Sequence, residues 1–315
     1  MLTDYHLHLR PDDEDTPPGR YFTAENVERY LAAASTRGIE EIGCAEHVYR
    51  FTQSLELWRH PWWERWATDD LGRYCEFVAS TPLRLGIECD FVPGAEDRTA
   101  ALLEAHPFDY VVGSVHFIGE GALDTEEFGI WESQGNPDEV WRRYFETVAE
   151  SARSGLFDII AHPDLVKYWG SARPSPERDP RFHYEPAVEA IAEAGVAVEV
   201  STAGLRKPVG EIYPAPAFAE MCVEAGSVFA LSSDAHHPEE VGYGYERAVE
   251  YLRGIGVGEI CVFEGRRRAL RALGAAAEGP GTAEDSATAE DSATEDSAAE
   301  GPATAEGPGA GERAA

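Results

Sequence analysis

The hydrophobic residues of the chain alternate between short apolar runs and longer amphipathic segments. The apolar runs occupy residues 40–45, 84–89, 109–115, 157–161, 196–200, 228–233 and 259–265. Helical spacing is found between them, in residues 69–79, 99–105, 139–154, 186–194, 216–225 and 246–256. Short strands separated by helices are typical of βα units, whose strands pair in parallel.

The number of these units predicts the architecture. We count about seven or eight, which favours an α/β fold closed into a (β/α) barrel over a small doubly wound sheet. A chain of 315 residues is long enough to bury one large core or two ordinary ones.

The composition changes after Leu273. The last part of the chain repeats AEDSAT-like units and holds ten acidic residues and one basic residue, Arg313. It has no large apolar residue and cannot offset its chain entropy by burial. We therefore expect a folded domain over 1–273 and a disordered acidic tail, a solubilising extension, over 274–315.

Charge and cysteine usage narrow the function classes. A formal net charge of −32 disfavours binding to nucleic acid through a basic surface, although a bound metal could still attract an anionic substrate. The sequence shows no signal peptide and no apolar stretch of membrane-spanning length. The five scattered cysteines are typical of buried residues in a reducing compartment. We expect a cytoplasmic protein, with no membrane partner, whose oligomeric state the sequence does not indicate.

Metal-ligand residue types recur where the predicted strands end. In the opening stretch DYHLH, His6 and His8 are two residues apart and therefore point to one face of a strand. Each match alone could be a solvated or hydrogen-bonded residue, but their repetition predicts a metal site at one end of the fold. The matching residues are Glu46, His47, Glu88, Asp90, His116, His162, Asp164, Glu199, Asp234 and His236.

The predicted ligands are imidazoles and carboxylates, without thiolates. Such a set favours Zn, Mn or Fe over a structural zinc–thiolate site or an all-oxygen calcium site. It is too large for one tetrahedral ion. A multinuclear centre, with Glu88 bridging two metals, would use it and could stabilise displacement at phosphorus.

These motifs resemble those of the PHP (polymerase and histidinol phosphatase) family. YHLH, AEH, GIE, GSVH, AHPDL and SSDAH occur in that order, and the resemblance runs from Asp4 to about Arg271. It implies a distorted (β/α)7 TIM-like barrel with a trinuclear metal site. GSVHF, IIAHPDLVK and TAGLRKPVGEIYP resemble the histidinol-phosphate phosphatase branch. That branch implies hydrolysis of L-histidinol phosphate, in histidine biosynthesis.

The resemblance also implies a ligand set for two to three divalent ions. The first metal would take His6, His8, Glu88 and Asp234, and the second Glu88, His116 and His162. The third would take His47, His236 and an acidic residue of the RPDDED loop, where many relatives have histidine. We choose Asp13, with Asp12 and Glu14 as alternatives.

The implied reaction is in-line attack on phosphorus by a metal-bridging hydroxide, with Glu88 and Asp234 holding the metals. The leaving alkoxide needs a proton or a metal contact, and Asp164, two residues after His162, could supply the proton. Alternatively, Asp164 orients a histidine from outside the ligand set.

Four residues are candidates for binding the substrate. Arg206 and Lys207 lie in a loop expected at the same end of the fold, and a guanidinium can bind phosphate through two hydrogen bonds. An ordinary surface loop is the alternative. Ser114 and Lys167, in the GSVH and AHPDLVK motifs, complete the set. Four tryptophans in ELWRHPWWERW are either a packed lid or core, or a cover on which an imidazole could stack.

Two other function classes remain. A PHP enzyme acting on nucleotides or oligonucleotide ends is disfavoured by the acidic composition and by the lack of a basic, aromatic-lined groove. A non-catalytic metal-binding protein is disfavoured by the complete ligand set. Comparing phosphate release from L-histidinol phosphate, from nucleoside monophosphates and from a short single strand would discriminate these function classes.

Overall fold

The computed structural model describes residues 1–11, 20–133 and 136–276, which build an α/β fold around two parallel sheets. The smaller sheet has the order β1 (Thr3–Asp4), β2 (Glu41–Cys44), β3 (Arg84–Leu85). The larger has the order β10 (Phe229–Ser232), β9 (Ala197–Ser201), β8 (Ile159–Ile160), β5 (Val112–Ser114), β4 (Glu88–Asp90). The prediction of an α/β fold with parallel strands is confirmed.

Two isolated parallel bridges connect the sheets. Leu7 pairs with Ala235, which links the segments that follow β1 and β10. His47 pairs with Glu88, which links the segment after β2 to β4. Leu7, Ala235 and His47 lie just beyond the carboxyl ends of their strands, whereas Glu88 is the first residue of β4.

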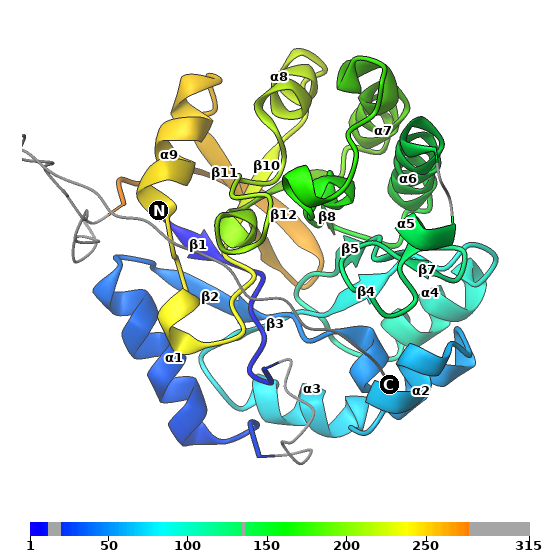
Figure 1. The fold of residues 1–315 in the computed structure, drawn as a ribbon. Helices are drawn as coiled ribbons and strands as arrows, with labels where there is room; N and C mark the ends of the chain where they lie inside the picture. Colours follow the sequence, from blue (N-terminus) through cyan, green and yellow to red (C-terminus); the bar gives the residue numbers. More distant parts are fainter. Residues whose placement is uncertain (12–19, 134–135, 277–315) are drawn as a thin grey trace, which may run out of the picture. The chain divides into compact units, whose positions relative to one another are not determined.

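Helices connect the parallel strands and lie outside them in Figure 1. The helices are α1 (Ala24–Thr36), α2 (Pro61–Trp66), α3 (Leu71–Ala79), α4 (Glu96–Glu104), α5 (Ile130–Ser133), α6 (Pro137–Arg153), α7 (Pro180–Ala194), α8 (Pro216–Glu224) and α9 (Tyr245–Gly254). The local sequence explains where several of these helices begin or end. Asn136 and Asp179 cap the first turns of α6 and α7, each followed by proline, and Gly195 ends α7 in the left-handed conformation at φ 67°.

One predicted βα strand is instead part of a hairpin. Residues Glu259–Glu264 form β11, which pairs antiparallel with β12 (Arg267–Ala272). The two residues between them, Gly265 and Arg266, have φ 55° and 60°, as a two-residue type I′ turn requires. A shorter hairpin joins β6 (Phe117–Ile118) to β7 (Gly121–Ala122). Periodicity did not reveal either turn, because a strand in a hairpin has the same alternation as a strand in a βα unit.

The buried apolar residues form two clusters. The larger one lies where the helices pack on the strands. The smaller one takes residues from β5, β8, β9, β10 and β11 and from segments next to strands: Tyr5, Ala45, Tyr110, Val112, Ile159, Ala161, Ala197, Ala230, Cys261 and Phe263. All five cysteines are buried and unpaired, as predicted. None of the helices formed by the described residues is both long and apolar enough to cross a membrane.

Candidate functional site

Seven of the predicted ligands lie just beyond the carboxyl ends of parallel strands, and the eighth, Glu88, lies beside them. His6 and His8 follow β1, His47 follows β2, and Glu88 begins β4. His116 and His162 each lie two residues beyond a strand, β5 and β8, and Asp234 and His236 follow β10. The carboxyl ends of parallel strands meet at one end of the sheet, so these side chains converge there.

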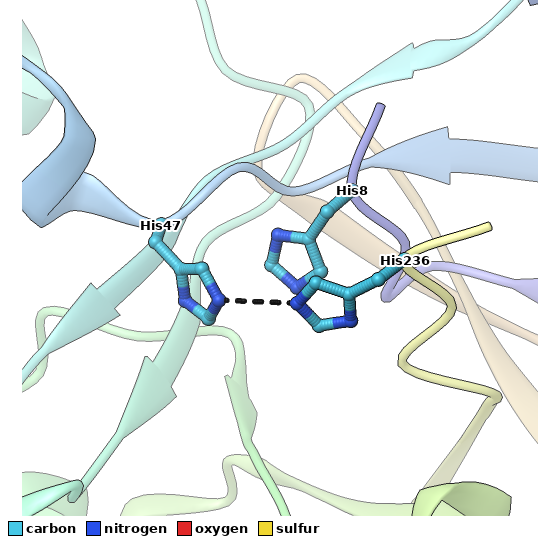
Figure 2. Close-up of side chains that lie close together, drawn as sticks. All are labelled: His8, His47 and His236. Atoms are coloured by element: carbon cyan, nitrogen blue, oxygen red, sulfur yellow. Dashed lines mark hydrogen bonds between the residues drawn. The ribbon is translucent and has the colours of Figure 1, made fainter. Parts of the chain in front are cut away.

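The convergence produces four overlapping groups of residues that could hold a metal ion. In each group, one ligand atom per residue lies within 4.8 Å of the others, and every member is buried. The groups are His6–His8–Glu88, Glu88–His116–His162, His6–His162–Asp234 and His8–His47–His236. Figure 2 shows the last group, in which the Nε2 atoms of His47 and His236 are 3.4 Å apart.

Glu88 lies at the centre of these groups. Its Oε1 is 3.3 Å from Nε2 of His162 and 3.5 Å from Nε2 of His116. Its Oε2 is 3.4 Å from Nε2 of His6 and also contacts Nδ1 of His47. The two oxygens of one carboxylate therefore face different groups, as a residue that bridges two ions must do.

The residues fit divalent metal ions. Nε2 of His6, Nε2 of His8 and Oε2 of Glu88 are buried without a hydrogen-bond partner in the described residues, as is Oδ1 of Asp234. Unpartnered polar atoms are costly in a protein interior. A shared cation would satisfy all of them, and imidazole with carboxylate suits Zn, Mn or Fe.

The charges also suit cations. Burial alone would raise the pKa of Glu88, but the histidines around it, His47 first, hold that pKa well below its usual range. Burial likewise opposes ionisation of Asp234, while His6 and His8 keep its pKa well below the ordinary value. Both carboxylates are therefore ionised at neutral pH.

Carboxylates outside the groups fix the orientation of two histidines and lie near a third. Glu199 contacts Nδ1 of His6 at 2.7 Å, and Asp90 contacts Nδ1 of His116 at 2.8 Å. Glu46 lies 3.9 Å from Nδ1 of His8 and accepts backbone hydrogen bonds from Leu9 and Arg10. The two hydrogen-bonded contacts leave Nε2 of His6 and Nε2 of His116 for a metal.

A cavity of about 190 Å³ opens beside the groups. Five predicted ligands line it: His47, His116, His162, Asp234 and His236. The other lining residues are largely aromatic and include Tyr49, Trp62, Trp66, Phe117, Tyr168 and Tyr213, together with Asp124 and Lys207. A small molecule with an anionic end and a ring would fit this combination.

Comparison with known proteins identifies the family. A sequence model of the PHP domain matches residues 22–203, more than half of the chain. The chain belongs to the PHP domain family. A "Probable histidinol-phosphatase" of Deinococcus radiodurans is 35% identical over 274 residues, covering 84% of this chain and 98% of that relative. The "Histidinol-phosphatase" of Bacillus subtilis is 26% identical over 269 residues, with 78% and 98% of the two chains covered.

A solved structure shares the fold of this PHP protein. The histidinol phosphate phosphatase of Lactococcus lactis, crystallised with zinc, L-histidinol and phosphate, superposes with a TM-score of 0.63 at 21% identity. The match covers 85% of this chain and 98% of that one.

The four residues of this PHP protein that were predicted to bind the substrate are not all in the cavity wall. Among the described residues, only Lys207 of the four lines the cavity. Arg206 donates hydrogen bonds to the carbonyl oxygens of Ser233 and Asp234, and so holds the loop that carries Asp234. Lys167 pairs with Asp164 and Glu211, and Ser114 is fully buried.

Asp164 does not line the cavity among the described residues, and its contacts favour a structural role. The carboxylate accepts a hydrogen bond from the backbone of Ala215 at 2.7 Å and lies 3.0 Å from Nζ of Lys167. These contacts connect the segment after β8 to the segment before α8.

The third-metal candidates Asp12, Asp13 and Glu14 lie outside the described residues.

Sequence reasoning counted Glu46, Asp90 and Glu199 among the matching residues but gave them no place in the ligand set, and it did not single out Asp124. The first three were visible at strand ends, and Asp90 shares a strand face with Glu88 because the two are two residues apart. Asp124 gave no signal, because it follows the β6–β7 hairpin that periodicity did not predict.

Proposed function

We propose that this chain is a metal-dependent phosphomonoesterase that hydrolyses L-histidinol phosphate to L-histidinol and phosphate. The observation that carries the proposal is the set of buried histidines and carboxylates beside an aromatic-walled cavity. Relatives named histidinol-phosphatase, matched over nearly their whole length, support the same substrate.

Two to three divalent ions, Zn, Mn or Fe, would occupy the site. His6, His8, Glu88 and Asp234 would hold one, and Glu88, His116 and His162 a second. His47 and His236 would hold the third, with Asp13 or a neighbouring acidic residue. When bound, such ions supply a nucleophile at neutral pH and balance the charge of the phosphate.

The other residues of the cavity would bind and orient the substrate. Lys207 lines the cavity, and its ammonium group would attract the phosphate. Trp62 and Trp66 on α2 line the same cavity and would exclude water while stacking on the imidazole ring. This assignment favours the covering role of the tryptophan-rich segment, although Trp63 is fully buried in the core.

The contacts between strands support a closed (β/α)7 barrel as the scaffold. The two bridges, Leu7–Ala235 and His47–Glu88, would complete the circuit of seven strand positions. The smaller apolar cluster would then fill the interior beneath the metal site. We propose that this domain spans 1–273 and that 274–315 is an acidic extension.

The test is substrate competition with the metal-loaded protein. Phosphate release from L-histidinol phosphate should exceed release from nucleoside monophosphates and from a 5′-phosphorylated single strand, by kcat/KM. Faster turnover of either nucleotide substrate would overturn the proposal.

A further inference from the structure

A second cavity, of about 280 Å³, lies at the end of the fold opposite the predicted ligands. Glu41 and Arg84 line it and begin the parallel strands β2 and β3, whereas His47 lies beyond the carboxyl end of β2. The β11–β12 hairpin, drawn in orange in Figure 1, supplies most of the other lining residues. No described residue lines both this cavity and the one beside the metal groups.

The end of this hairpin concentrates positive charge in an acidic protein. Four arginines lie within six residues of a chain whose formal net charge is −32. Two of them are held by Asp158: Arg266 forms an ion pair with it, and Arg268 interacts with it electrostatically. The other two, Arg267 and Arg271, are exposed, line the cavity and form no ion pair with a described residue.

The acidic residues of the cavity do not neutralise Arg267 and Arg271. Glu264 stands directly opposite Arg267 in the strand pairing, but its carboxylate lies 3.1 Å from a guanidinium nitrogen of Arg84. The carboxylate of Glu41 lies 2.9 Å from the same guanidinium group. Because Arg84 balances these carboxylates, the charges of Arg267 and Arg271 are left to attract an anion from solvent.

The spacing of the two arginines favours an extended anion. Residues four apart in a strand project from the same face about 13 Å apart. A guanidinium group binds phosphate oxygens through two parallel hydrogen bonds. A chain of two or three phosphates would reach both groups, whereas a single phosphate would require both long side chains to converge on one point, at a cost in side-chain entropy. Phe263 is the one aromatic residue among the described lining residues and is 3% exposed, so it offers no face on which a base could stack.

We propose that this cavity binds a small anion with adjacent phosphate groups, through Arg267 and Arg271. Inorganic tripolyphosphate and the phosphate chain of a nucleoside triphosphate share that chemistry. The inference does not rest on the proposed function, because none of the residues of the metal groups lines this cavity.

The experiment is isothermal titration calorimetry of the metal-loaded protein with tripolyphosphate, with free metal in excess so that the anion does not strip the metal centre. The double variant Arg267→Gln/Arg271→Gln keeps polar side chains and removes both charges. Since a hydrogen bond to a charged group is worth about a factor of ten or more in affinity, its Kd should rise roughly 100-fold. Its kcat/KM for L-histidinol phosphate should be unchanged, because the cavity lies at the other end of the fold.

ATP and AMP identify the part of the anion that is recognised. ATP should bind with a Kd similar to that of tripolyphosphate, and AMP much more weakly. Tighter binding of ATP than of tripolyphosphate would support the inference and assign the cavity to nucleoside triphosphates. Binding of AMP as tight as that of ATP would overturn it, because one phosphate would then suffice.

Arg73→Gln/Arg247→Gln is the matched control. It removes two charges from exposed arginines on α3 and α9 that are not among the described residues lining the cavity. The control should bind tripolyphosphate like the unmodified protein. An equal Kd in the two double variants would overturn the inference and assign Arg267 and Arg271 to keeping the exposed edge of β12 from pairing with another strand. Absence of binding to the unmodified protein would also overturn it.

Discussion

Oε1 of Glu199 lies 2.7 Å from Nδ1 of His6, and Oε2 of the same carboxylate accepts the backbone hydrogen bond of His162 at 2.6 Å. Ser232 donates a third hydrogen bond, at 2.7 Å, to Oε1. One buried carboxylate on β9 thus orients a ligand from β1 and a ligand from β8 at once. The φ of His162 is 24°, a conformation that residues with side chains rarely adopt, and the hydrogen bond from Glu199 helps to hold it.

Replacing Glu199 with Gln should weaken metal binding. The amide has one acceptor oxygen, so its NH2 group must face either the N–H of His162 or the donors at His6 and Ser232. Loss of such a partner typically costs 10- to 100-fold in metal affinity or activity, and we expect a loss of about that size. Metal affinity by competitive chelation and kcat at saturating metal would measure it.

Glu189→Gln provides the comparison, because Glu189 is an exposed carboxylate on α7. It should bind metal like the unmodified protein. Equal metal affinity in Glu199→Gln and Glu189→Gln would contradict the orienting role of Glu199. A lower kcat in Glu199→Gln that excess metal restores would support that role.

Replacing Glu88 with Ala should remove metal from more than one position. Glu88 belongs to two of the four groups and contacts five histidines, so no other ligand can substitute for it. Activity should be abolished and metal content should fall, while circular dichroism shows a preserved fold. Normal turnover in a preparation of measured metal content would refute the bridging assignment.

Chelation should destabilise the protein as well as inactivate it. An ion that binds only the folded state stabilises it by about 4 kcal/mol at a thousandfold excess over Kd. Removing the metal also leaves buried imidazole nitrogens and carboxylate oxygens without a partner, which destabilises the folded state. Scanning calorimetry should therefore show a lower Tm, restored by added Zn, Mn or Fe. An unchanged Tm after elemental analysis confirms complete metal removal would argue against a metal centre.

The sequence predicted the parallel strands and the ends at which the ligand types gather, because strand periodicity and strand-end position are local properties. Residues such as Glu88 and His116 could be placed at one end of the fold on that basis. The contacts of Arg206 could not be predicted, since its partners Ser233 and Asp234 lie on a different loop. The contacts of Asp164 could not be predicted from the local sequence either, because its carboxylate pairs with Lys167 and with the backbone of the distant Ala215.

Deleting residues 277–315 should leave kcat and KM unchanged. The described residues that line the cavity all lie between His47 and His236, and the deleted segment has no large apolar residue that could pack on them. Steady-state kinetics on the truncated protein would measure this. A large loss of activity would show that the acidic extension takes part in catalysis or substrate binding. Lower solubility with unchanged kinetics would instead support a solubilising role.

Replacing Arg50 with Ala should strongly destabilise the fold. Nη1 of Arg50 donates to Oε2 of Glu46 and to the carbonyl oxygen of Arg10, both at 2.5 Å, in a fully buried network. Removing one partner of a buried ion pair leaves an uncompensated charge and typically costs about 3–5 kcal/mol. Arg142→Ala, which breaks the exposed pairs with Glu139 and Glu146, should cost much less. Chemical denaturation of both variants would compare the two losses.

The same pair has a defined dependence on pH. Burial alone would raise the pKa of Glu46, but Arg50 and then His8 lower it from 4.5 to about 2. A carboxylate whose pKa is depressed by folding contributes stability that is complete above the unfolded value and is lost as the pH falls toward the folded one. The difference in unfolding free energy between the unmodified protein and Arg50→Ala should therefore be constant near neutral pH and shrink between 4.5 and about 2. A difference that grows on acidification would show that Glu46 is not the group whose charge Arg50 compensates.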